Sequence, residues 1–282
     1  MIYSCLAAPV RFLLPIFALI IPLSLAEAAS DSTEPISASA VLDPKESPQG
    51  EFLIGVHFKI QAGWHLYWRH AGDVGLPTQV RFTLPKGASA GELQWPIPVR
   101  FTQAGGLVGI GYEDEVVLFS KLKVPGDSAN NEISLQARWV ACSSKICVPG
   151  KKEFHFKVAD LMSRSGLELM EFAKWAEEVP VGLDQTKADV LSHCSFDSSN
   201  PKLSRHEVVF DWKIPATPID WFPQLDRTIK MTGFKIETLG SKTTVSFNLE
   251  RFEQSPWSDL EAVVVIDSAG RRLGFTHPLN CK

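Results

Sequence analysis

The sequence predicts an all-β protein made of two tandem antiparallel sandwiches with a short helical connection between them. Short segments of alternating apolar and polar residues recur in both halves of the chain. Turn-forming residues separate these segments, and the chain holds 19 glycines and 19 prolines. A helical period occurs at 163–179, between the two sets of predicted strands.

Residues 1–28 have the features of a cleaved export signal. Arg11 supplies the positive charge, 12–25 is an apolar run, and Ala26 and Ala28 are small residues at the expected cleavage site. The run is too short for a stable membrane span, so we expect no stable membrane insertion of the mature chain. Cys5 lies in this segment and would be lost with it. An exported chain enters an oxidising compartment, where cysteine pairs form disulfides.

Size and charge limit the classes of function. Cleavage leaves about 254 of the 282 residues, which is enough for one large domain or two ordinary ones. The formal net charge of −4 gives no basic surface for nucleic acid, so no nucleic-acid partner is expected.

The first predicted β domain spans residues 29–160. In 52–60, for example, Ile54, Val56 and Phe58 alternate with Gly55 and His57. The segment 93–98 should be extended because its prolines disfavour helix in the residues before them. Loops are predicted at 69–77 and 99–106. The predicted strands are 36–42, 52–60, 80–84, 112–124, 133–141 and 153–158.

A helical linker is predicted at 161–181, and a second β-sandwich domain at 182–282. The linker contains a helix from Ser163 or Ser165, which can cap its start, to Pro180, which ends it. In the second domain, Trp221 to Pro223 is expected in a loop and Cys194 before the first strand. The predicted strands are 207–214, 229–239, 243–249 and 262–266.

Four cysteines remain after cleavage. Cys142 and Cys147 have four residues between them, so a bridge would close only a small loop and stabilise little. Spacing alone leaves a reversible dithiol and a small structural disulfide about equally open. Cys194 and Cys281, if paired, would close a loop of 86 residues, worth roughly 4 kcal/mol in the chain-entropy model. That pairing is expected to be structural.

Four blocks of the first β domain identify it with a known family. They are Gly63-Trp-His-Leu-Tyr-Trp-Arg69 with Gly72-Asp-Val-Gly-Leu-Pro77, Trp95-Pro-Ile-Pro98, Gly111-Tyr-Glu-Asp-Glu-Val116, and Trp139-Val-Ala-Cys-Ser-Ser-Lys-Ile-Cys-Val-Pro-Gly150. Over about 34–160 the chain resembles the N-terminal periplasmic domain of the DsbD and ScsB thiol:disulfide interchange proteins. The helical linker and the block from Trp221 to Pro223 resemble the ScsB arrangement less specifically.

The resemblance implies an immunoglobulin-like sandwich, a periplasmic location and a redox role for Cys142 and Cys147. In this family, electrons pass from the cytoplasm through a membrane domain to this domain, which reduces periplasmic thioredoxin-like proteins. The implied partners are therefore such proteins and a membrane electron-transfer protein of the DsbD/ScsB type. The sequence ends at Lys282 with no membrane conduit or thioredoxin-like domain, so these parts would be separate proteins or the relay would be lost.

Four residues are candidates to support the cysteine pair. Lys145 is a cation within the pair that would favour a thiolate, or an ordinary turn residue. His65 and Tyr67 share one face of a strand, and the resemblance gives polar aromatics there a proton or hydrogen-bond role; a surface histidine and a packed tyrosine are the alternative. Phe101 would cover the disulfide, as a loop does in this family, or would simply be a core residue. Gly105 and Gly106 would let its loop open.

Other chemistries have weaker support. His57, His65 and His70 with the two thiols are possible copper or zinc ligands, but the chain has no Cys-x-x-Cys, no His-Glu-x-x-His and only four methionines. We expect no cofactor and no metal, although the resemblance to ScsB leaves a link to copper tolerance open. No hydrolase elbow or phosphate-binding loop is present. The sequence thus favours thiol–disulfide exchange; the alternative is a non-catalytic binding or assembly module with a structural disulfide.

Overall fold

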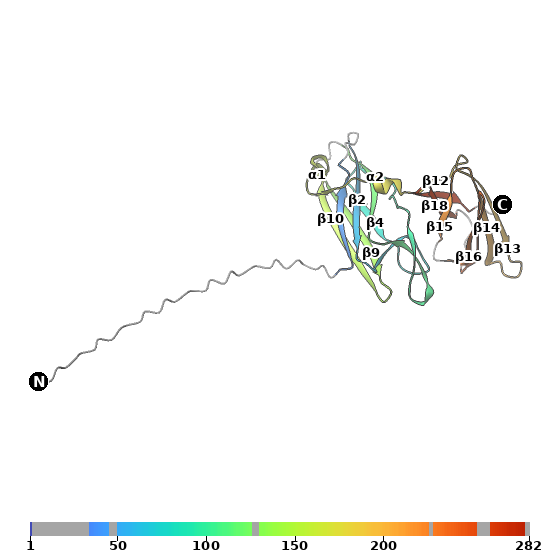
Figure 1. Ribbon diagram of the computed structural model, residues 1–282. Helices are drawn as coiled ribbons and strands as arrows, with labels where there is room; N and C mark the ends of the chain where they lie inside the picture. Colours follow the sequence, from blue (N-terminus) through green and yellow to red (C-terminus); the bar gives the residue numbers. More distant parts are fainter. Residues whose placement is uncertain (2–33, 45–49, 126–129, 226–227, 253–259, 280–282) are drawn as a thin grey trace. The chain divides into compact units, whose positions relative to one another are not determined.

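The computed structural model describes residues 1, 34–44, 50–125, 130–225, 228–252 and 260–279. The part from Glu34 onward forms one compact unit. Its described residues form four β-sheets and two short α-helices, so the predicted all-β class is confirmed (Figure 1). The predicted export signal lies outside the described residues.

Two sheets form the first sandwich. One has the order β11-β1-β2-β8-β5, from Glu168–Leu169, Ile36–Leu42, Glu51–Ile60, Glu115–Lys123 and Ser89–Ala90. The other has the order β10-β9-β3-β7-β6, from Cys147–Lys157, Glu132–Cys142, His65–Gly72, Val108–Tyr112 and Val99–Thr102, and β4 (Gln79–Thr83) also pairs with β9.

The core between these sheets comes from the inward positions of the alternating strands. Ile54, Val56 and Phe58 of β2 are fully buried, as the alternation predicts, and Leu135 and Ala137 of β9 are as well. Their removal from water supplies the main driving force for this half of the fold. The aligned strands carry the loops at the ends of the sandwich, where the candidate site lies.

The second sandwich also has two sheets. One has the order β12-β19-β18-β15, from Val181–Gly182, Arg271–Pro278, Glu261–Ser268 and Thr217–Pro223. The other has the order β13-β14-β17-β16, from Ala188–Phe196, Leu203–Trp212, Lys242–Arg251 and Ile229–Leu239. A separate buried cluster that includes Phe210, Trp221 and Phe247 lies between them.

The predicted single helix at 163–179 is wrong. The segment contains α1 (Val158–Ser163), the short strand β11 and α2 (Ala173–Glu177) instead. Arg164 adopts the left-handed conformation and Gly166 has φ of +75°, so the helix ends there. Leu169 then pairs with Leu42 of β1, because a free sheet edge offers that segment backbone partners. The domain boundaries and the linker role stay predictions.

Several loops predicted from sequence are strands. Residues 99–102 form β6, the block from Trp221 to Pro223 belongs to β15, and β3 continues to Gly72. Cys194 lies within β13 rather than before the first strand of its domain. The predicted strand 112–124 is interrupted by a turn at Asp114, which has φ of +58°. Proline and glycine made these segments resemble loops, whereas their long-range strand partners determine their conformation.

In the described part of the chain, no helix has both the length and the apolar character needed to cross a membrane.

Candidate redox site

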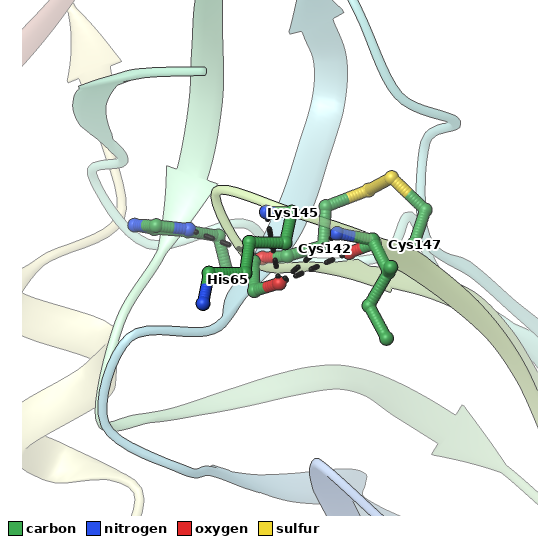
Figure 2. Close-up of a disulfide and its surroundings, with 6 residues drawn as sticks. His65, Cys142, Lys145 and Cys147 are labelled. Carbon is green, nitrogen blue, oxygen red and sulfur yellow. Dashed lines mark hydrogen bonds between the residues drawn. A yellow bond between two sulfur atoms is a disulfide. The ribbon is translucent and has the colours of Figure 1, made fainter. Parts of the chain in front are cut away.

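The cysteine pair closes the end of the β9–β10 hairpin. Cys142 is the last residue of β9, Cys147 is the first of β10, and the two are directly opposite in the ladder. Their Sγ atoms are bonded in a disulfide, with the Cα atoms 4.0 Å apart (Figure 2). The Ser143 amide donates to the Ile146 carbonyl over 2.9 Å. The Ser143 hydroxyl also accepts hydrogen bonds from the amides of Lys145 and Ile146, each over 3.2 Å, so the loop is fixed by local contacts.

The two cysteines differ in access to solvent. Cys142 is 0% exposed and packs in a cluster with Tyr67, Ala71 and Phe101. Cys147 is exposed. A disulfide sulfur must be approached by an attacking thiolate to exchange. The Cys147 side is therefore the one that a second protein can reach.

His65 contacts the backbone of the cysteine pair. It is opposite Cys142 in the β3–β9 pairing, and its Nδ1 lies 3.2 Å from the Cys142 carbonyl oxygen. Its Nε2 lies 2.9 Å from Oε1 of Glu113. Figure 2 shows the ring on the side of Cys142 away from the sulfur atoms. His65 is thus placed to fix the backbone at Cys142 and not to contact either sulfur.

Phe101 belongs to the buried cluster that contains Cys142. Its ring stacks on His65 with the centroids 3.9 Å apart and lies 5.6 Å from the Tyr67 ring. The residue is 7% exposed and belongs to the cluster that contains Cys142. Gly109, its partner in β7, makes room for the ring, since a Cβ there would lie 2.2 Å from a Phe101 ring carbon. Phe101 therefore lies in the same buried cluster as Cys142, on a strand and not in the predicted loop, and its role as a cover stays a prediction.

Tyr67 and Lys145 have different surroundings. Tyr67 is 1% exposed, and burial raises the pKa of its phenol, which keeps the hydroxyl neutral. Gly75, with φ of +90°, lets the 72–77 loop pack on the Tyr67 ring. Lys145 lies exposed in the loop between the cysteines. Tyr67 thus packs against the pair, and Lys145 belongs to the surface that surrounds Cys147.

The other two cysteines lie far from this site in the sequence. Cys194 is in β13, opposite His206 of β14. Cys281 lies outside the described residues, so their pairing stays a prediction. Within the described ranges, no group of three or more histidine, cysteine, aspartate or glutamate side chains is arranged to hold a metal ion.

Sequence reasoning missed three residues at the site. Glu113 binds the His65 ring, Gly109 accommodates Phe101, and Arg100 fixes the other face of β6. Glu113 and Gly109 lie in or beside the block 111–116 that carries the family resemblance, which was a usable signal. Arg100 had none, because its partner lies 120 residues away.

Comparison with known proteins agrees with this geometry. The family model described as "Thiol:disulfide interchange protein DsbD, N-terminal" matches residues 32–159. Among solved structures, the chain is similar to the crystal structure of the N-terminal periplasmic domain of ScsB from Proteus mirabilis. The TM-score is 0.61 with 17% sequence identity, over 88% of this chain and 93% of that chain. No curated protein matched.

The structural likeness reaches across both sandwiches and shows a shared immunoglobulin-like fold. The family match covers the strands that hold Cys142, Cys147, His65 and Phe101. Residues 32–159 therefore form a domain of the DsbD/ScsB N-terminal family.

Proposed function

We propose that this protein passes reducing equivalents to other proteins by thiol–disulfide exchange at Cys142 and Cys147. The observation that carries the proposal is the exposed Cys147 bonded to the buried Cys142 at the end of a hairpin. One sulfur is accessible to a partner, while the other is held beside it to complete the exchange.

The exchange transfers two electrons to the partner in two steps. The Cys147 thiolate of the reduced pair attacks a disulfide of the partner, which forms a mixed disulfide and releases one partner thiolate that takes a proton from water. The Cys142 thiolate then attacks the Cys147 sulfur and releases the second partner thiolate. The partner gains two electrons, and the Cys142–Cys147 disulfide is formed again. A dithiol donor must then reduce it for the next cycle.

The surroundings of the pair support a reversible bond. The β9–β10 ladder continues for ten further residue pairs beyond Cys142 and Cys147, so the hairpin does not depend on the disulfide. The loop that the bond closes is small, so its contribution to stability in the chain-entropy model is only about 2 kcal/mol.

Family membership supplies the classes of partner. The DsbD/ScsB family implies thioredoxin-like periplasmic proteins as acceptors and a membrane electron-transfer protein as donor. A periplasmic location, reached through cleavage of residues 1–28, belongs to the same proposal. His65 and Phe101 would act by fixing and covering Cys142, and Lys145 by its charge near Cys147.

Trapping of a mixed disulfide tests the proposal. The Cys142→Ala variant keeps the exposed thiol but cannot complete the exchange, so it should accumulate a mixed disulfide with an oxidised thioredoxin-fold protein. The Cys147→Ala variant, which keeps only the buried thiol, is the matched control and should trap far less. Non-reducing gels with mass spectrometry measure both. Trapping by neither variant would leave a binding module with a structural disulfide as the better account.

A further inference from the structure

Arg100 and Phe101 are neighbours on β6, and they connect two different parts of the molecule. Successive side chains of a strand point to opposite faces. Phe101 packs beside Cys142, whereas Arg100 contacts Asp220 and Trp221 of β15 in the second sandwich. One face of β6 thus contributes to the cluster around Cys142, and its opposite face contacts the second sandwich.

The Arg100 contacts are numerous and partly buried. Its Nε lies 3.0 Å from Oδ2 of Asp220 and its Nη2 lies 2.9 Å from Oδ1, which makes the pair bidentate. The same Nη2 donates to the Trp221 carbonyl over 2.8 Å. The guanidinium carbon lies 5.4 Å from the Phe222 ring centroid and 5.0 Å from that of Phe234. A planar, forked cation is the side chain suited to such a site.

The strand pairing of β15 is irregular next to Asp220. The pairing of β15 with β18 shifts register between Pro218 and Asp220, which is the pattern of a β-bulge. Bulges re-aim side chains next to functional sites. The side chains of Arg100 and Asp220 are 23% and 17% exposed, so water screens their attraction only in part.

β6 lies at the edge of its sheet. It is the last strand in the order of its sheet and pairs with β7 over four residues. The loop after it contains Gly105 and Gly106, both at positive φ and with open space around them. An edge strand has backbone hydrogen-bond partners on one side only. The contact between Arg100 and Asp220, on the face of β6 opposite Phe101, therefore affects where Phe101 lies.

We propose that Asp220 of the second sandwich is a positioning residue for the redox site, acting through Arg100 to hold Phe101 over Cys142. The inference rests on the proposed thiol exchange, because it assigns the second β domain a role in controlling access to that disulfide. Weakening of the Arg100–Asp220 pair lets β6 move and uncovers the buried Cys142, whereas Cys147 is exposed in either case.

The test measures how fast dithiothreitol reduces the Cys142–Cys147 disulfide, by quenching with an alkylating agent and mass spectrometry. Asp220→Ala should speed reduction about tenfold, which corresponds to 1.4 kcal/mol and lies within the range of coupling between contacting residues. Asp189→Ala is the matched control, since Asp189 also pairs with a cation, Lys213, in the second sandwich. It should leave the rate unchanged.

A double variant distinguishes positioning from general loosening. Phe101→Ala should itself speed reduction, and Asp220→Ala should add nothing in that background, because the residue through which it acts is gone. Equal acceleration by Asp220→Ala in both backgrounds, or none in the wild-type background, would overturn the inference. Should Asp220→Ala fail to fold, Arg100→Lys gives the same test, since lysine keeps the charge but loses the bidentate geometry.

Reduction by dithiothreitol requires no biological partner. The reduction rate therefore tests the positioning role of Asp220 independently of the proposed exchange function. Acceleration by Asp220→Ala without mixed-disulfide trapping by Cys142→Ala contradicts the exchange function and keeps the positioning role. Trapping with an unchanged reduction rate contradicts only the positioning role.

Discussion

Cys142 and Cys147 have the same side chain, and the fold gives them different surroundings. Cys142 is enclosed by Tyr67, Ala71 and Phe101, while Cys147 begins the exposed edge of β10. Burial in apolar surroundings disfavours a thiolate, whereas access favours reaction. Phe101 is one of the side chains in the buried cluster around Cys142.

Gly109→Ala should displace that ring without touching either cysteine. The new Cβ would lie 2.2 Å from a Phe101 ring carbon, so the ring must shift. We expect reduction of the disulfide by dithiothreitol to be faster and the free energy of unfolding to fall by about 1–3 kcal/mol. Gly182→Ala is the control, since nothing lies within 4 Å of a Cβ there. A lower stability with an unchanged reduction rate would contradict the covering role of Phe101.

At the scale of elements, the ladders explain what the sequence could predict and what it could not. Ile229–Leu239 was predicted with its observed bounds, because its alternation is set by its own residues. The sequence predicts a loop at 99–102, where the structure has β6, because the conformation of this segment depends on pairing with β7 and on the contacts of Arg100. The region 163–179 has helical spacing, yet an available edge of β1 draws its middle into β11.

The residues of the candidate site were likewise predictable from the sequence only in part. Its cysteines were evident from spacing and from the family blocks, and the resemblance offered Phe101 as a cover for them, with core packing as the alternative. Glu113 lies in one of the family blocks, whereas Asp220 is joined to the site only by contacts with Arg100, which is distant in sequence. Local pattern carries no information on such contacts.

At the scale of the whole molecule, two buried histidines make stability depend on pH. Burial lowers the pKa of His206 and of His277 to about 4, from 6.5. His277 Nε2 accepts a hydrogen bond from the Trp221 indole over 2.9 Å, which requires that nitrogen to be unprotonated. Both residues lie in the second sandwich, where they are stable only in the neutral form.

We therefore expect the protein to lose stability as the pH falls from about 6.5 towards 4. In this range the unfolded chain binds more protons at these histidines than the folded chain does, so the free energy of unfolding decreases as the pH falls. Each group contributes up to about 3 kcal/mol by pH 4. Chemical denaturation at a series of pH values measures the slope, which His277→Gln should reduce. An equal slope in that variant would assign the pH dependence to other groups.

A graded redox titration of the mature protein tests the central claim most directly. Structural bridges in exported proteins typically have potentials below about −300 mV. The exchange account predicts that Cys142–Cys147 is reduced at a less negative potential than this, before any other bridge, while the circular dichroism spectrum of the folded chain persists. Reduction only below about −300 mV, accompanied by unfolding, would contradict it.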